Sequence, residues 1–471
     1  MQVQTNEGIQ RNRMKALLHR IILPGICVLI LASLFYSLLW ENEAPVLTCT
    51  ELPPVLGDAY PVECTALDAG SGIRCITVSI EQDGIPHFLT DHFVPHRGTR
   101  HQCISFQFDI NHPGIHDGQA RLVFRATDYS FSKNVGTVSS SFVIDTTPPR
   151  VTRCNTPPPL RPGDTSFVAY RLSEVPARSG VLVNEHYFPS FPDTVNGEGL
   201  YVSCFALPLT ESLIVPSILI TAEDKVGNIV RHPVKIAYAP VKYRHDDIVL
   251  SDTFFTSVIL HLPASPVDAD ISPPSCFHMI NESLREKNME TVCALCRSFT
   301  PRRLWNGPFE TLENAVVTGS FGDRRTYYYR NEIIGEGVHL GVDYASVRHA
   351  PVRAANTGTV VYAAPLGIFG NTVLIDHGRG LFSLYAHLSR IAVHSTERAV
   401  KGNLIGYTGS TGMSMGDHLH ISMILGGVFV DPQAWSRHNG ITSCIERLRT
   451  SVLSHQDMMV QSERDSFSMS R

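Results

Sequence analysis

Gly416-Asp-His-Leu-His-Ile-Ser-Met-Ile-Leu425 is the stretch on which the prediction of the fold rests. Its composition is typical of a β-strand, in which residues i and i+2 point to the same face. His418 and His420 are therefore expected to face one cavity, with their positions about 6–7 Å apart along the strand. This spacing suits one metal ligand and one neighbouring histidine that acts on water or substrate.

A second polar cluster lies upstream, in Gly337-Val-His-Leu-Gly-Val-Asp-Tyr-Ala345. His339 and Asp343 are four residues apart, which would suit a helix, but two glycines and two valines favour a strand followed by a loop. Two histidines and one aspartate, with a fourth position left to water, are the ligand set of a catalytic zinc site. The sequence predicts one zinc ion per chain, bound by His339, Asp343 and one of His418 and His420.

These motifs resemble the catalytic domain of the M23 zinc metallopeptidases, the LytM and lysostaphin family that cuts peptidoglycan cross-bridges. The resemblance covers about 130 residues and includes segments 319–325, 351–361 and 370–378. It places His339 and Asp343 at the HxxxD ligands and His420 at the third ligand. It also implies an antiparallel β metallopeptidase domain over residues 311–440.

The same resemblance implies that His387 and His418 are catalytic, one as the base and the other as a stabiliser of the transition state. Zinc lowers the pKa of bound water, and a neutral imidazole can accept the proton; which histidine is the base stays open. Asn371 and Tyr385 are predicted substrate contacts, with simple packing as the alternative for both. Ordinary core or surface roles are expected for the remaining nearby histidines, His349, His377 and His394.

Two departures from the family pattern affect expectations about the substrate. The family usually has Glu two residues after the third ligand, where this chain has Ser422. Residues 346–350 replace a glycine-containing turn. Neither departure removes a predicted ligand.

The amino-terminal region contains an uncharged run of 20 residues from Ile21 to Trp40, about the length that spans roughly 30 Å of hydrocarbon. Basic residues precede the run and Glu41 and Glu43 follow it, which predicts a cytoplasmic tail over residues 1–20 and a transmembrane helix over residues 21–40. A cleaved signal peptide is the alternative, but the run is long and no Ala-x-Ala site follows. The predicted location is the bacterial inner membrane, with one pass and with the catalytic domain in the periplasm or extracytoplasmic space.

The composition is that of a folded protein with several domains. The chain has 471 residues, which predicts about three domains. A net charge of -5 without a basic block gives no reason to expect nucleic-acid binding. Eleven cysteines, or ten without Cys27, suit an oxidising compartment.

Residues 44–147 and 148–240 are predicted to form two β-sandwiches that resemble bacterial immunoglobulin-like modules. Short alternating strands recur between turn residues, and the two segments form an internal repeat. Aligning the repeats pairs Cys49 with Cys103 and Cys154 with Cys204, and leaves Cys64 to pair with Cys75. Buried thiols are the alternative. A spacer or wall-binding arm is the expected role.

Residues 241–310 are predicted to form a short helical linker, because apolar residues recur there near the 3.6-residue period. Arg285 is assigned to the exposed face of this helix. Cys293 and Cys296 form a CxxC pair, for which a disulfide staple is favoured over a zinc or redox site; the pairing among Cys276, Cys293, Cys296 and Cys444 stays open. Residues 441–471 are predicted to be largely disordered.

The overall prediction is a mainly β, membrane-anchored zinc endopeptidase that hydrolyses peptide cross-links in peptidoglycan. The alternative is a non-catalytic or latent regulator of the same fold that activates other cell-wall hydrolases. Retention of all three ligands favours the enzyme. Expected partners are peptidoglycan, the inner membrane through residues 21–40, and wall-hydrolase or divisome proteins; the bond cleaved, the oligomeric state and autoinhibition stay open.

Overall fold

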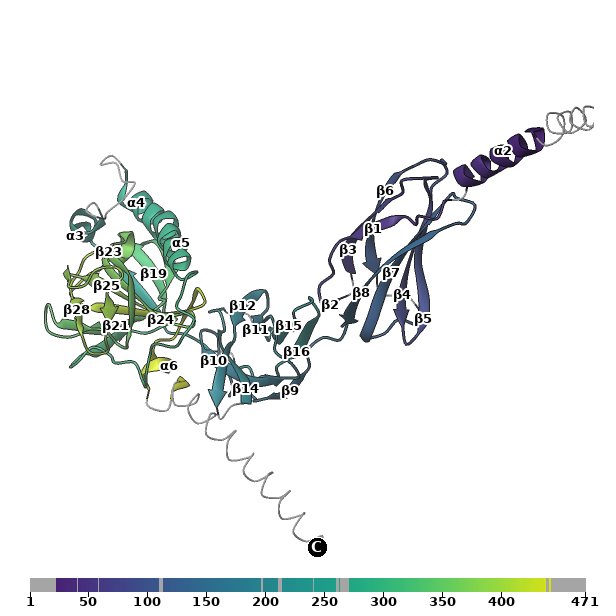
Figure 1. Cartoon of the computed structure of the whole chain (residues 1–471). Coiled ribbons are helices and arrows are strands. Elements are labelled where there is room, and N and C mark those ends of the chain that lie inside the picture. The colour runs from purple at the N-terminus through teal and green to yellow at the C-terminus, as the bar shows by residue number, and fades with distance from the viewer. Residues whose placement is uncertain are drawn as a thin grey trace, which may run out of the picture. The chain divides into compact units, whose positions relative to one another are not determined.

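The computed structural model describes residues 23–39, 41–57, 59–109, 113–195, 198–210, 214–239, 241–259, 262, 271–437 and 440–441 (Figure 1). The chain divides into two compact units, residues 1–148 with 226–228, and residues 149–225 with 229–471. Strands dominate both units, so the prediction of a mainly β protein is confirmed.

The amino-terminal helix corrects the membrane prediction. α2 (Leu23–Leu39) has 17 residues, whereas about 20 are needed to span the hydrocarbon core. Within the described residues, no helix is both long enough and apolar enough to cross a membrane. The prediction of an anchor over residues 21–40, with the inner-membrane location derived from it, is therefore wrong. The predicted tail over residues 1–20 lies outside the described residues.

The first unit encloses one core between two sheets. The smaller sheet has the order β1 (Val46–Cys49), β3 (Ala59–Leu67), β6 (His101–Asp109). The larger has the order β2 (Val55–Leu56), β8 (Val135–Ile144), β7 (Gly118–Asp128), β4 (Ile73–Gln82), β5 (Ile85–Phe93). Ile76, Val78 and Ile80 alternate along β4, are fully buried, and fill the core.

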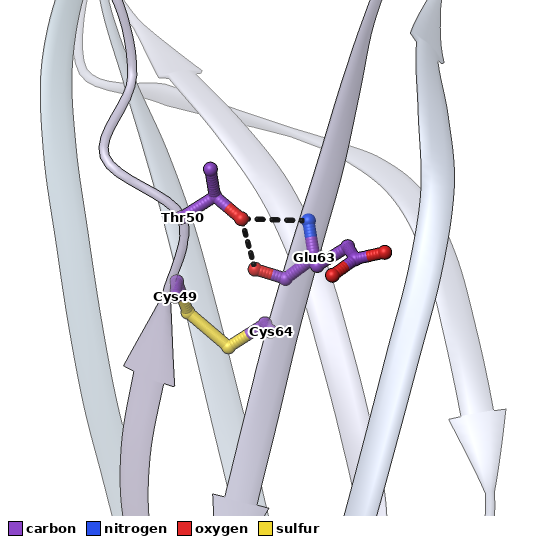
Figure 2. The surroundings of a disulfide bond; sticks show 4 residues. All are labelled: Cys49, Thr50, Glu63 and Cys64. Atoms are coloured by element: carbon purple, nitrogen blue, oxygen red, sulfur yellow. Dashed lines mark hydrogen bonds between the residues drawn. A yellow bond between two sulfur atoms is a disulfide. The ribbon is translucent and has the colours of Figure 1, made fainter.

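The disulfide in this unit differs from the predicted pairing. Cys49 and Cys64 lie directly opposite each other in the β1–β3 ladder and are bonded (Figure 2). Cys103 lies on β6, on the other side of β3, and cannot reach Cys49. Cys75 lies in the other sheet, where its thiol contacts Asp91. The predicted Cys49–Cys103 and Cys64–Cys75 bonds are therefore wrong, because neighbouring strands determine the pairing.

The second unit begins with another pair of four-stranded sheets. One has the order β13 (Phe191–Val195), β14 (Glu198–Ala206), β10 (Thr165–Leu172), β9 (Val151–Cys154), and the other β12 (His186–Pro189), β11 (Arg178–Val183), β15 (Ile218–Glu223), β16 (Ile229–Pro233). Cys154 and Cys204 are separated by β10 and are free, so their predicted bond is also wrong. The immunoglobulin-like assignment of both sandwiches stays a prediction.

Residues 241–310 contain the predicted helices and also one strand. The elements are β17 (His245–Val249), α3 (Asp252–Ser257), α4 (Pro273–Met279), the π-helix η3 (Ile280–Leu284) and α5 (Arg285–Leu295). Cys276, Cys293 and Cys296 are free, so the structure contains no staple among them. Cys444 lies outside the described residues.

An antiparallel sheet of eight strands forms the carboxy-terminal part. Its order is β18 (Val316–Gly319), β21 (Val342–Ala345), β29 (Leu419–Leu425), β25 (Leu381–Leu388), β24 (Asn371–Gly378), β23 (Gly358–Pro365), β27 (Arg398–Ala399), with β30 (Val428–Val430) beside β29. Every residue of β25 and β29 is buried, which explains their long apolar runs.

Smaller elements surround this sheet. β17 pairs in parallel with β19 (Arg324–Tyr329), which forms a hairpin with β20 (Glu332–Val338). A three-stranded sheet contains β22 (Pro351–Arg353), β28 (Leu404–Tyr407) and β26 (Arg390–Ile391). The carboxy-terminal part also contains two short helices, η4 (Gly367–Phe369) and α6 (Gln433–Ser436).

Candidate metal centre and active site

His339, Asp343 and His420 bring three acceptor atoms together. His339 Nε2 lies 3.0 Å from both Asp343 Oδ1 and His420 Nδ1, and His420 Nδ1 lies 2.9 Å from Asp343 Oδ1. All three side chains are buried. Asp343 on β21 is directly paired with His420 on β29, and His339 immediately follows β20. Two central strands and one hairpin therefore position the cluster.

The other polar atom of each residue is held by a neighbour. His339 Nδ1 lies 2.8 Å from the backbone oxygen of Ser320, and His420 Nε2 lies 2.8 Å from Ser422 Oγ. These partners assign the proton of each neutral imidazole to the nitrogen facing away from the cluster. Arg325 donates to Asp343 Oδ2 at 3.0 Å.

The result is three lone pairs that face one another with no hydrogen between them. Such acceptors repel unless a cation lies among them. Their spacing is close to the edge of a tetrahedral zinc site, about 3.3 Å for bonds of 2.0–2.1 Å. His339, Asp343 and His420 can therefore hold a metal ion.

The charge states also suit a cation. Arg325 forms an ion pair with Asp343 at 3.0 Å, and this positive charge favours the ionised carboxylate. Burial lowers the pKa of His420 to about 4, which keeps that imidazole neutral near pH 7.

His387 and His418 lie beside the three-residue cluster. Their rings are 4.8 Å apart, and His418 Nε2 is 3.7 Å from Asp343 Oδ1. His387 Nδ1 donates to the backbone oxygen of Thr411 at 2.8 Å, and His418 Nδ1 donates to that of Gly416 at 2.9 Å. Both rings therefore keep Nε2 as an acceptor.

His387 has an unusual backbone and environment. Its φ of 61° is in the left-handed region, which residues other than glycine rarely adopt and which recurs at functional sites. Burial, and then the neighbouring His418 and His420, lower the pKa of His387 to about 3. The imidazole is therefore neutral near pH 7.

The five residues line one pocket of about 410 Å³. Ile248, Phe369 and Met413 contribute apolar walls, and two arginines, Arg285 and Arg325, contribute positive charge. The pocket thus joins three converging acceptors, two further imidazoles and a partly apolar wall, which is a combination typical of active sites.

Comparison with known proteins identifies this part of the chain. Residues 337–432, which contain all five site residues, match the sequence model of peptidase family M23. The chain contains an M23 peptidase domain.

The relatives match this chain over about a hundred residues. The DD-carboxypeptidase/endopeptidase Mpg of Neisseria meningitidis serogroup B is 43% identical over 96 residues, which are 20% of this chain and 22% of that relative. The peptidoglycan DD-endopeptidase ShyA of Vibrio cholerae serotype O1 is 32% identical over 111 residues, 24% of this chain and 25% of that relative. The chain thus spans about a quarter of the length of these relatives.

Among solved structures, the catalytic domain of lysostaphin from Staphylococcus simulans is 28% identical. The match covers 26% of this chain and 92% of that domain, with a TM-score of 0.22.

The two predicted substrate contacts lie away from the pocket of the M23 domain. Tyr385 is fully buried, and its hydroxyl accepts hydrogen bonds from the backbone of Ala355 and from Ser383. Asn371 donates its side-chain amide to the backbone oxygen of Leu388 at 2.9 Å. Neither residue lines the pocket, so packing describes both positions.

The three nearby histidines for which ordinary core or surface roles were expected lie in the core or at the surface. His349 and His394 are exposed, and His377 is fully buried against Phe309 with its Nε2 2.7 Å from Ser383 Oγ.

Several residues that hold the site were missed by sequence reasoning. Thr411 orients His387, and Arg325 neutralises the outer oxygen of Asp343. Arg285, assigned to an exposed face, lines the pocket instead. Only Ser422 had a sequence signal: the serine stands where the family usually has Glu, and it takes up the hydrogen bond of His420.

Proposed function

We propose that this chain is a zinc metalloendopeptidase that hydrolyses peptide cross-links of peptidoglycan, with His339, Asp343 and His420 as the metal ligands. The observation that carries the proposal is the convergence of three oriented acceptors beside the imidazoles of His387 and His418 in one pocket. The names of Mpg and ShyA, a DD-carboxypeptidase/endopeptidase and a peptidoglycan DD-endopeptidase, support a bond between D-amino acids as the target.

When bound, zinc supplies Lewis-acid chemistry: it polarises the scissile carbonyl and lowers the pKa of water toward neutrality. Arg325 and Ser422 keep the ligands of the domain in the tautomer and charge state that binding requires. The apolar part of the pocket wall lowers the local dielectric and strengthens the electrostatic interactions of the reaction.

His418 is proposed as the base, because its side chain is 18% exposed and its cationic form loses less hydration than that of a fully buried imidazole. It takes the proton of the attacking water at Nε2 and returns it to the leaving amine. His387 stays neutral, and its Nε2 accepts a hydrogen bond that orients the reacting N–H or O–H group.

The test measures zinc content and then follows the digestion of purified peptidoglycan by mass spectrometry. The proposal expects about one zinc per chain and release of peptide cross-link fragments. His420→Ala should lose both, whereas His394→Ala, at an exposed histidine, should retain both. Zinc without cleavage would favour the regulator, which binds the wall and activates other hydrolases. A chain without zinc would overturn the metalloenzyme.

A further inference from the structure

Arg285 enters the pocket from outside the segment that matches the M23 family. It is the first residue of α5, directly after the π-helix η3, whereas the family match covers residues 337–432. A π-helix places an extra residue in a turn and recurs at functional sites. Here it leaves Asn281, Arg285 and Asn288 directed toward the peptidase domain and not toward solvent.

The two asparagines fix this helix against the domain. Asn281 is buried and donates to the backbone oxygen of Glu336 at 2.7 Å. Asn288 is also buried, and its side-chain oxygen accepts from the backbone N–H of Ile368 at 2.9 Å. Gly335 lies against Phe277 so closely that a Cβ there would approach the ring to 3.0 Å. The helix is therefore a fixed wall of the pocket.

Arg285 is held by one edge of its guanidinium. Its Nε donates to the backbone oxygen of Asn281 at 3.2 Å, and its Nη2 donates to Asn281 Oδ1 at 2.9 Å. Beyond this edge, Nη2 lies 4.0 Å from Met413 Sδ, across the pocket wall. A guanidinium has five N–H donors, so this arrangement orients the group and leaves donors toward the pocket.

The charged side chains that line the pocket differ in whether they have a partner of opposite charge. Arg325 forms an ion pair with Asp343, and Asp246 forms one with Arg244 at 2.6 Å. Asp417 accepts from Thr408 at 2.6 Å and from the backbone of His349 at 3.2 Å. Within the described part of the chain, Arg285 forms no ion pair with a carboxylate. It is thus the pocket cation that remains available to a ligand.

Burial is consistent with a ligand for this cation. Burial lowers the pKa of Arg285, and the opposing effects of Tyr327 and of the more distant charge of Glu282 do not outweigh it. At Arg325 burial acts in the same direction, but the charge of Asp343 outweighs it and the pKa is raised. Tyr327 contacts both guanidinium groups, so Arg285 lies near Arg325, the partner of the Asp343 ligand.

We propose that Arg285 binds a free carboxylate of the peptide substrate next to the scissile bond and makes the peptidase prefer acidic peptides. The proposal rests on the peptidase function above. A guanidinium matches a carboxylate with two parallel hydrogen bonds, and an amidated carboxyl group offers neither the charge nor two acceptors. Arg285 is therefore a residue that determines specificity.

The experiment uses the full chain loaded with zinc and two synthetic cross-linked peptides. The peptides are identical except that the carboxyl group next to the scissile bond is free in one and amidated in the other. We expect kcat/KM to be about tenfold to a hundredfold higher for the free carboxylate, the range for a hydrogen bond to a charged group. Arg285→Gln should abolish this preference by slowing cleavage of the free carboxylate only, and Arg285→Lys should restore part of it.

Lys287→Gln is the matched control, because it removes an exposed positive charge two residues away on the same helix. It should keep the preference. Equal losses on both peptides in Arg285→Gln would indicate a purely structural role and overturn the proposal, as would a wild type without preference.

A wild type that cleaves neither peptide would contradict the peptidase function, and calorimetry would then test Arg285 separately. Tighter binding of the free carboxylate by the wild type, lost in Arg285→Gln, would support the carboxylate site. Equal binding of the two peptides, or none, would overturn it.

Discussion

Replacing Ser422 by alanine should weaken zinc binding without removing a ligand. Ser422 is fully buried on β29, and its hydroxyl lies 2.8 Å from Nε2 of His420. The hydrogen bond fixes the tautomer in which Nδ1 faces Asp343. Loss of such a partner typically costs tenfold to a hundredfold in metal affinity, so we expect a zinc dissociation constant about 10 to 100 times larger.

The neighbouring strand offers a matched control. Ser383 is fully buried on β25, and its hydroxyl lies 2.7 Å from Nε2 of His377, which binds no metal in our proposal. Both alanine variants should lose about 1–3 kcal/mol of stability, because Ser422→Ala leaves the buried Nε2–H of His420 unsatisfied and Ser383→Ala leaves the buried Nε2 lone pair of His377 unsatisfied. Only Ser422→Ala should change zinc affinity, measured by competition with a chromophoric chelator. Unchanged affinity in Ser422→Ala, or an equal loss in Ser383→Ala, would refute the tautomer argument.

Three further predictions concern stability and charge. Burial lowers the pKa of His377 to about 4, so between pH 4 and about 6.5 the unfolded chain binds a proton that the folded chain does not. The contribution of His377 to the free energy of unfolding should be complete above pH 6.5 and fall by about 3 kcal/mol as the pH drops to 4. Denaturant melts should show that the free energy of unfolding depends less steeply on pH in His377→Gln. Reducing the Cys49–Cys64 bond, which closes a separation of 15 residues, should destabilise the first unit by about 2–4 kcal/mol, seen as a lower melting temperature, whereas Cys103→Ser should leave the transition unchanged. Arg325→Gln should lower kcat/KM at least tenfold by leaving Asp343 without its counterion, and an unchanged rate would contradict the role of that ion pair.

The sequence predicted the strand-borne part of the site well, because that part depends on local spacing. The two-residue period of a strand places His418 and His420 on one face, and the adjacent β21 brings Asp343 opposite His420. Ser320 and Thr411 could not be predicted in the same way. They act through backbone oxygens, which every residue possesses, so their identity carries no signal.

The cysteines and Arg285 show two different reasons for wrong predictions. The repeat alignment treated equivalent positions as partners, but a disulfide needs neighbouring strands, and β3 and β10 lie between the predicted partners. Arg285 was assigned to the exposed face on the assumption of a regular 3.6-residue period. The π-helix at residues 280–284 changes that period by one residue and rotates Arg285 toward the pocket.

The same π-helix separates the chemistry of the pocket from its selectivity. The acceptors for the metal and the two free imidazoles all lie within residues 337–432, on strands and loops whose geometry the sheet fixes. Another part of the pocket wall, with Ile248, Phe254 and Arg285, comes from β17, α3 and α5, outside the family match. Changes in these elements can alter which peptide fits without moving a metal ligand. The side chains of Asn281 and Asn288 bond to backbone atoms of Glu336 and Ile368, and neither of these is a metal ligand. Selectivity for an acidic peptide would therefore reside in the helix, and hydrolysis in the sheet.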